Sequence, residues 1–131
     1  DYSNNSKLES ITNQIKEFAP DTVIIRLGEN FNKEYYQQGI SFYDYFFKLV
    51  KFSKEHAKNV IVTSLFWRLP EVDEDIKNAA FNNNVKYIDI RDLGDDKKYM
   101  AIGKFKHPGV EIHPGDLGMK EIANRIIKEL K

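Results

Sequence analysis

The chain has 131 residues, a length that suits a single domain with a core of ordinary size. Hydrophobic residues make up 41% of it and charged residues 31%, which is typical of a folded globular protein and excludes a disordered chain. Twenty acidic side chains balance twenty basic ones, so the net charge gives no reason to expect a nucleic-acid partner or an anionic membrane. The absence of cysteine excludes disulfides, a thiolate zinc site and a cysteine nucleophile.

The first half of the chain predicts helix, strand and helix in turn. Apolar residues at helical spacing predict a first helix that ends before Pro20. The short apolar run "TVIIRL" at 22–27 is typical of a strand that is covered on both faces. After a polar loop, a second helix is expected from about Ser41, because Ser41 and Asp44 have capping-box spacing. Its apolar stripe consists of Phe42, Tyr45, Phe46, Leu49 and Val50.

The second half repeats this alternation. The run "NVIVTSL" at 59–65 predicts a second buried strand, a shorter helix follows around 72–80, and "KYIDI" at 86–90 predicts a third strand. Asp116 has a suitable side chain to N-cap a last helix, and no apolar run is long enough to span a bilayer. We therefore expect one α/β domain over 1–131, with a mostly parallel, flavodoxin-like sheet between two layers of helices.

Ligands of such sheets bind beyond the carboxyl ends of the strands, which directs attention to "GEN" and "FWRLP". Gly28 permits an unusual backbone turn, and the side-chain amide of Asn30 could donate a hydrogen bond to a developing oxyanion. Gly-x-Asn is also common turn chemistry, so both interpretations stay open. Trp67 and Phe66 are candidates for the wall of a substrate pocket, with plain packing as the alternative.

The histidines differ in their surroundings. His113 lies in the short loop "EIHPGDLG" before the last helix, where it is either a general base or a residue that bonds to the backbone near the helix start. His107, in "KHPGV", is a weaker candidate for a functional role. His56 lies near the end of a predicted helix, where a partial positive charge is favourable, so a structural role is expected.

The other charged and aromatic residues predict no further site. Asp89 and Asp92 flank a strand end and are expected to form turns. The acids of "EVDEDIK" fall in the first turn of a helix and are not spaced as metal ligands, so we predict neither a metal nor a cofactor. No basic stripe accompanies the tyrosines, which argues against a surface that stacks on nucleic-acid bases.

Together these segments resemble the SGNH hydrolases, also called the GDSL family of esterases and lipases. The family's third block reads Gly-x-Asn-Asp after a strand, and "GENF" is similar to it, with Phe31 in place of the aspartate. The fifth block reads Asp-x-x-His, and "VEIHPGDLGM" resembles it from His113 to Met119, with Val110 at the position of the triad aspartate. The segment 99–119 also looks like the closing segment of uncharacterised bacterial members of this group.

The resemblance implies roles for individual residues. His113 takes the position of the general base, and Asn30 that of the side-chain donor of the oxyanion hole, with Gly28 and Trp67 beside the oxyanion or the pocket. Because an aspartate is missing from the fifth block, His113 needs another orienting group. Glu111, a backbone carbonyl, or no partner at all, as in a Ser–His dyad, are the options.

The family's first two blocks, including Gly-Asp-Ser with the nucleophile, do not occur in these residues. Ser64 lies within "VIVTSLF" rather than on the sharp turn that exposes a nucleophile. The sequence also starts without a methionine, so we expect the C-terminal portion of a longer hydrolase. In a sheet ordered 2-1-3-4-5, such a portion holds strands three to five and lacks the central first strand. The strand at 22–27 would then have an unpaired edge, which we expect the missing N-terminal segment or a second copy of the chain to cover.

The implied activity is ester hydrolysis without a cofactor, on acyl (acetyl) groups carried by a carbohydrate, in a secreted or periplasmic protein. The alternative is a non-catalytic binding or interaction module that kept the fold after losing the nucleophile. A flavodoxin-like nucleotide binder is disfavoured, because the chain has no Gly-rich phosphate loop.

Overall fold

The centre of the fold is a parallel three-stranded sheet. The computed structural model describes residues 5–131. The strands are β1 (Thr22–Ile25), β2 (Asn59–Thr63) and β3 (Lys86–Ile88), in the order β1-β2-β3. Both pairings are parallel. The α/β class and the parallel sheet predicted from the sequence are thereby confirmed.

All three strands are shorter than the apolar runs that predicted them. The runs at 22–27, 59–65 and 86–90 each leave the ladder two residues before their end. After β1 the backbone turns toward Gly28, whose φ of +122° lies outside the extended region. After β2 the hydroxyl of Ser64 accepts a hydrogen bond of 2.8 Å from a backbone N–H beyond β3, so a side chain replaces the next ladder bond.

The helices follow the predicted order. The longer ones are α1 (Asn5–Phe18), α3 (Phe42–His56), α4 (Pro70–Asn82) and α7 (Asp116–Leu130). The short helical segments are α2 (Glu34–Gln37), α5 (Arg91–Gly94), the 3-10 turn η1 (Lys97–Tyr99) and α6 (Pro108–Glu111). None of the helices in residues 5–131 is long and apolar enough to cross a membrane.

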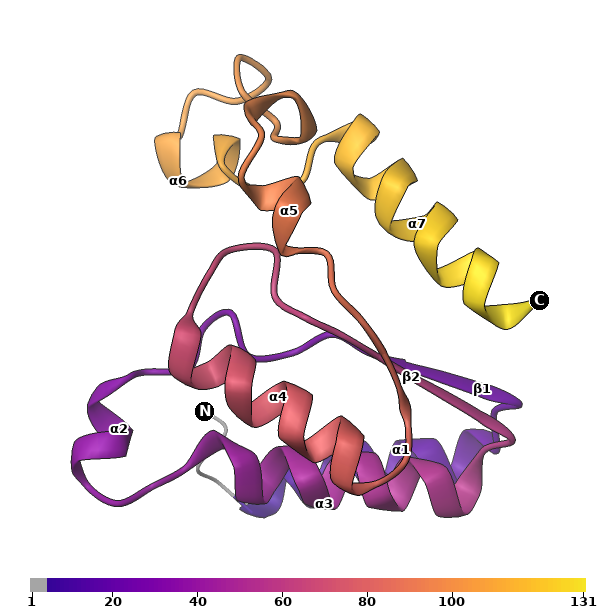
Figure 1. Ribbon diagram of the computed structural model, residues 1–131. Helices are drawn as coiled ribbons and strands as arrows, with labels where there is room; N and C mark the ends of the chain where they lie inside the picture. Colours follow the sequence, from indigo (N-terminus) through magenta and orange to yellow (C-terminus); the bar gives the residue numbers. More distant parts are fainter. Residues whose placement is uncertain (1–4) are drawn as a thin grey trace.

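Helices cover both faces of the sheet. Because side chains alternate along a strand, Ile25 and Val62 point to one face, where they pack with α3, α4 and the apolar side of α1. Ile61 and Ile88 point to the other face and pack with Ile122 of α7. Figure 1 shows α1, α3 and α4 on one side of the strands and α7 on the other.

The start of α3 confirms the predicted cap. The Ser41 hydroxyl accepts a 3.0 Å hydrogen bond from the backbone N–H of Tyr43. A carboxylate of α4, Asp75, accepts from the same N–H and from the Tyr36 hydroxyl at 2.6 Å. Burial and this carboxylate together raise the pKa of Tyr36. At the other end of α3, His56 stacks on Phe52, as expected for a structural histidine.

The start of α7 corrects one prediction. Asp116 is the first residue of the helix rather than its N-cap, and Gly115 occupies the N-cap position. The backbone N–H of Gly115 donates to the carbonyl of Tyr99 at 2.8 Å. A Cβ at this glycine would lie 2.7 Å from the carbonyl oxygen of Met100. The close approach of these two segments therefore fixes where the helix begins.

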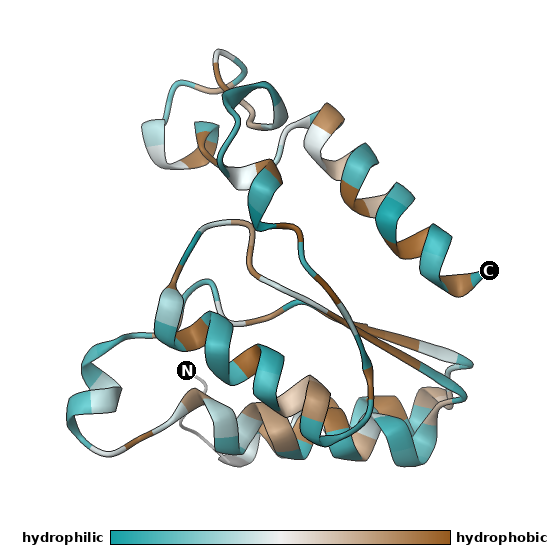
Figure 2. Ribbon diagram, viewed as in Figure 1, coloured by the Kyte–Doolittle hydropathy of each residue, from teal (hydrophilic) through white to brown (hydrophobic). Residues whose placement is uncertain are grey.

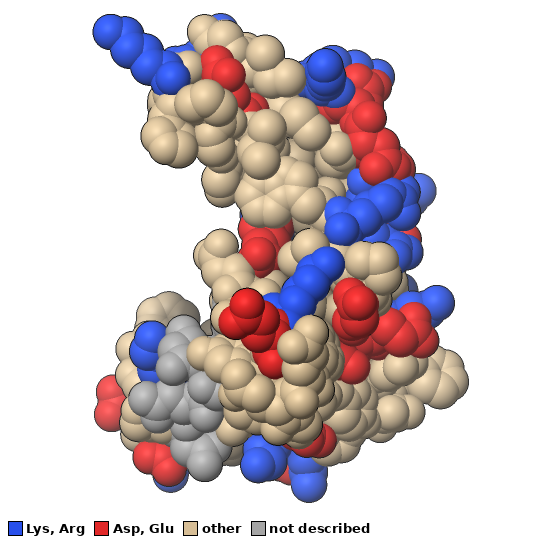
Figure 3. All heavy atoms as spheres, turned by 90° about the vertical axis from the view of Figure 1, so that its left-hand side faces the viewer, with Lys and Arg blue, Asp and Glu red and all other residues tan. Residues whose placement is uncertain are grey.

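The outer edge of β1 has no strand partner within residues 5–131, because β1 lies at the end of the sheet. Ile24, on the face that α7 covers, remains 49% exposed, since α7 packs over β2 and β3 only. Figure 3 shows the molecule hollowed on one side, between its upper and lower parts.

Candidate functional site

Three segments meet at the carboxyl ends of the strands. The connection after β1 carries Gly28 and Asn30, and the connection after β2 carries Trp67. The loop with His113 lies between α6 and α7. In Figure 1 the connections after β1 and β2 leave the strands at their left-hand ends, and α6 also lies toward the left of the view. This is the edge at which parallel α/β sheets bind their ligands.

Gly28 lies three residues beyond the end of β1, immediately before a turn at Glu29 and Asn30. Its φ of +122° is a backbone conformation that side chains with a Cβ rarely adopt. The site is also closely packed, because an added Cβ would lie 3.0 Å from Val72 and 3.2 Å from Phe42. Gly28 is therefore required both by the backbone and by the space around it.

Glu29, which sequence reasoning passed over, joins two of the three segments. Its carboxylate accepts 2.7 Å from the guanidinium of Arg26 and 3.2 Å from the backbone N–H of Phe66. The second contact fixes the connection after β1 against the connection after β2. The only signal in the sequence is the i, i+3 spacing of Arg26 and Glu29, which indicates the ion pair and not the second contact.

Asn30 and Phe31 differ sharply in burial. Asn30 is exposed and forms no hydrogen bond within the part of the chain that the structure describes. Phe31, at the position of the family's aspartate, is buried and packs edge-to-face on Phe42, with 5.2 Å between ring centroids. The position of an expected acid is therefore occupied by a core residue. The convergence of Asn30 and His113 on one substrate atom stays a prediction.

His113 is held by its own backbone neighbourhood. Its Nδ1 lies 2.8 Å from the carbonyl oxygen of Gly109. A carbonyl can only accept a hydrogen bond, so Nδ1 carries the proton, and in the neutral ring Nε2 keeps its lone pair. The main chain is fixed as well, because Ala101 N–H donates to the carbonyl of His113 at 2.9 Å. An exposed imidazole with a fixed tautomer is the arrangement that a general base requires.

The hydrogen-bond partner of the His113 ring is thus a backbone carbonyl, which is one of the orienting groups that the sequence left open. Glu111 does not occupy this place, because its carboxylate accepts instead from the backbone N–H of Gly103 at 3.0 Å. Val110, at the position of the triad aspartate, is part of α6 and is partly exposed.

Trp67 forms a wall beside His113. The two rings meet edge-to-face with 4.7 Å between centroids and an interplanar angle of 83°. The indole Nε1 donates to the carbonyl of Ile112 at 3.0 Å, which fixes the ring against the His113 loop. Phe66, in contrast, is completely buried in the core.

This contact predicts a spectroscopic signal. Trp67 is the only tryptophan of the chain, so its emission reports on one site. We expect His113→Ala to move the emission maximum to longer wavelength, because removing the imidazole exposes an edge of the indole to water. His56→Ala, at a ring that stacks on Phe52 instead, is expected to leave the maximum unchanged. An unchanged maximum in His113→Ala would contradict the ring contact.

The other histidine and serine candidates have structural roles. His107 caps α6, because its Nδ1 accepts a 3.0 Å hydrogen bond from the N–H of Gly109. Ser64 is completely buried, and its hydroxyl contacts a carboxylate oxygen of Asp89 at 3.2 Å. It is not placed as a nucleophile.

The acids after β3 form ion pairs as well as turns. Asp89 pairs with Arg91, which lowers the pKa of its carboxyl group. Asp92 binds Arg125 of α7 at 2.6 Å, and this contact lowers the pKa of Asp92. Within residues 5–131, no three His, Asp or Glu side chains are grouped as metal ligands.

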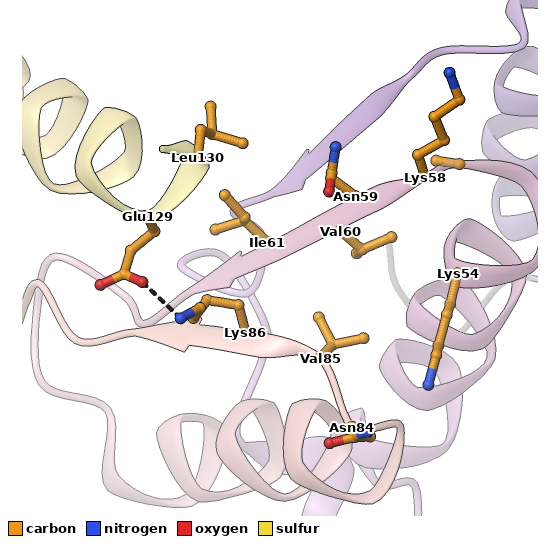
Figure 4. A pocket seen from close by; sticks show the side chains of 11 residues that line it. Lys54, Lys58, Asn59, Val60, Ile61, Asn84, Val85, Lys86, Glu129 and Leu130 are labelled. Carbon is orange, nitrogen blue, oxygen red and sulfur yellow. Dashed lines mark ion pairs between the residues drawn. The ribbon is translucent and has the colours of Figure 1, made fainter.

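A second hollow lies at the opposite, amino ends of β2 and β3 (Figure 4). It has a volume of about 370 Å³, and lysines line part of it. Each of these lysines already has a partner: Lys86 pairs with Glu129 at 2.7 Å, Lys58 with Asp21, and Lys54 donates to a backbone carbonyl. None of the residues predicted to be functional lines this hollow.

Comparison of the chain with protein-family models, with curated proteins and with solved structures found no match. The functional proposal therefore depends on the geometry of His113, Trp67 and the connections after β1 and β2.

Proposed function

We propose that this chain is the part of an SGNH-type ester hydrolase that supplies the general base and the oxyanion donor. The observation that carries the proposal is His113, whose Nδ1 is held by the Gly109 carbonyl and whose exposed ring lies against Trp67. The resemblance of the sequence motifs adds the substrate class, acyl groups carried by a carbohydrate, as an analogy.

The order of the sheet supports this proposal. The strands β1, β2 and β3 are consecutive neighbours, as strands three to five of a sheet ordered 2-1-3-4-5 would be. The free edge of β1 is then the place where the family's first strand pairs. That strand ends in the nucleophile of the family.

In the proposed mechanism, a serine from a segment outside these residues attacks the ester carbonyl and passes its proton to His113 Nε2. The amide of Asn30 and backbone N–H groups donate hydrogen bonds to the oxyanion of the tetrahedral intermediate. The imidazolium then protonates the departing alcohol, which leaves an acyl-serine. Water, deprotonated by His113, attacks this ester, and the proton returns to the serine as the carboxylic acid is released.

A non-catalytic binding module is the second candidate. It is favoured by one observation: the hydroxyls of Ser53 and Ser64 are buried and bonded within the fold, and Ser41 caps α3. None of these three serines is available to His113 as a nucleophile.

The two candidates differ in a simple experiment. The 131 residues alone should not hydrolyse p-nitrophenyl acetate above background, because a base without a nucleophile forms no acyl-enzyme. The protein extended by the segment that precedes Asp1 should hydrolyse it, and a serine-directed phosphonate should label that protein once. An extended protein that neither hydrolyses the ester nor takes the label would refute the hydrolase and support the binding module.

A further inference from the structure

A group of exposed apolar side chains surrounds α6. Ile102, Phe105, Val110 and Ile112, here called the tip patch, are between 39% and 54% exposed. The N–H of Gly103 donates to the carboxylate of Glu111, a contact that holds the turn before α6 beside the helix. The four side chains therefore come from two segments that lie together. In Figure 2 this tip, at the top of the molecule, shows hydrophobic residues alternating with hydrophilic ones.

Two lysines accompany the tip patch in the sequence. Residues 102–112, which span the patch, contain Lys104, Lys106 and one acidic residue. Lys104 and Lys106 directly flank Phe105, and neither forms an ion pair with another residue in 5–131. The acidic residue, Glu111, is already bonded to the backbone.

We propose that the tip patch docks on the surface of a membrane that contains anionic lipids. The apolar side chains would enter the boundary between headgroups and acyl chains, while the two lysines meet lipid phosphates. A lipid surface suits this pattern because apolar and basic residues alternate along a protruding segment, and an interface offers both environments side by side. A groove on a partner protein would instead need a separate apolar pocket for each apolar side chain and a separate acidic group for each lysine. This inference goes beyond the proposed hydrolase and does not depend on it.

The test uses the 131-residue chain and vesicles, in a sedimentation assay. Vesicles with roughly one-third phosphatidylglycerol in phosphatidylcholine should bind the chain at low salt, and pure phosphatidylcholine should bind it at least about tenfold more weakly. High salt should release the protein, because it screens the lysines. Equal binding to both kinds of vesicle, or binding to neither, would overturn the proposal.

Variants locate the contact. Phe105→Ser and the double variant Lys104→Glu with Lys106→Glu should each weaken binding at least about tenfold. The matched controls are Phe81→Ser, at an aromatic residue on α4 that is 81% exposed, and Lys77→Glu on the same helix. Both controls should bind like the parent chain, and equal loss in them would refute the tip patch as the contact.

A second copy of the chain is the competing occupant. If Phe105→Ser converts a dimer into a monomer in analytical ultracentrifugation while no vesicle binds the parent chain, the patch is a self-association surface and the proposal is wrong. The assay measures no hydrolysis, so its outcome is separate from that of the esterase.

Discussion

Replacing His113 with alanine is expected to lower kcat of the extended, serine-containing protein by at least about a hundredfold, the usual contribution of a positioned base. In the proposed mechanism, the attacking serine then has no acceptor for its proton and the departing alcohol has no donor. The value of kcat/KM should fall by a similar factor, because the proton transfer belongs to the transition state and not to substrate binding. Steady-state kinetics on an acetyl ester measure both quantities.

The control for this prediction is His56→Ala. His56 lies in the last turn of α3 and contacts Phe52, away from the candidate site, so kcat should change less than about twofold. Full activity of the His113→Ala protein would show that the loop between α6 and α7 only turns the chain.

Replacing Gly28 with alanine is expected to lower the free energy of unfolding by roughly 2–5 kcal/mol. Two causes add: the φ of +122° strains a residue with a Cβ, and the new methyl group would meet Val72 at 3.0 Å and Leu65 at 3.3 Å. Urea denaturation should show a lower midpoint with an unchanged m-value.

Gly39→Ala separates the two causes. Gly39 has a φ of +74°, and an added Cβ would have no neighbour within 4 Å. It should therefore cost only the backbone strain, about 1 kcal/mol. Equal losses for Gly28→Ala and Gly39→Ala would show that packing around Gly28 is more adaptable than its contacts indicate.

The placement of the elements follows from hydrophobic periodicity, because burial of one face is what selects a helix or a strand. Their ends do not follow from it. The start of α7 is decided by Gly115, which a segment fifteen residues earlier approaches closely. β1 ends at Ile25, three residues before the unusual backbone of Gly28, and the ladder after β2 changes where the Ser64 hydroxyl replaces a backbone acceptor. A run of apolar letters contains no sign of either.

In the candidate site, too, some features could be predicted from the sequence and others could not. The position of His113 before the last helix could be predicted from the spacing of its motif. The group that contacts its ring could not, since Glu111, a backbone carbonyl and no partner at all were each compatible with the sequence. The contact between Trp67 and His113, and the bond from Phe66 to Glu29, join residues that are far apart in the chain. Such contacts depend on how the strands are ordered, which no local pattern specifies.

The free edge of β1 also bears on the solubility of the chain. The β1 sequence "TVII" is β-branched and uncharged, and an exposed strand of this kind is a template for further strands and thus for aggregation. At pH 7 the chain carries no net charge, so long-range repulsion does not keep copies apart. Charged residues flank the strand, Asp21 before it and Arg26 after it, and each already forms an ion pair, with Lys58 and with Glu29. Charges beside an apolar strand oppose its pairing with other copies, so we expect neutralising Asp21 and Arg26 to favour the growth of intermolecular sheets.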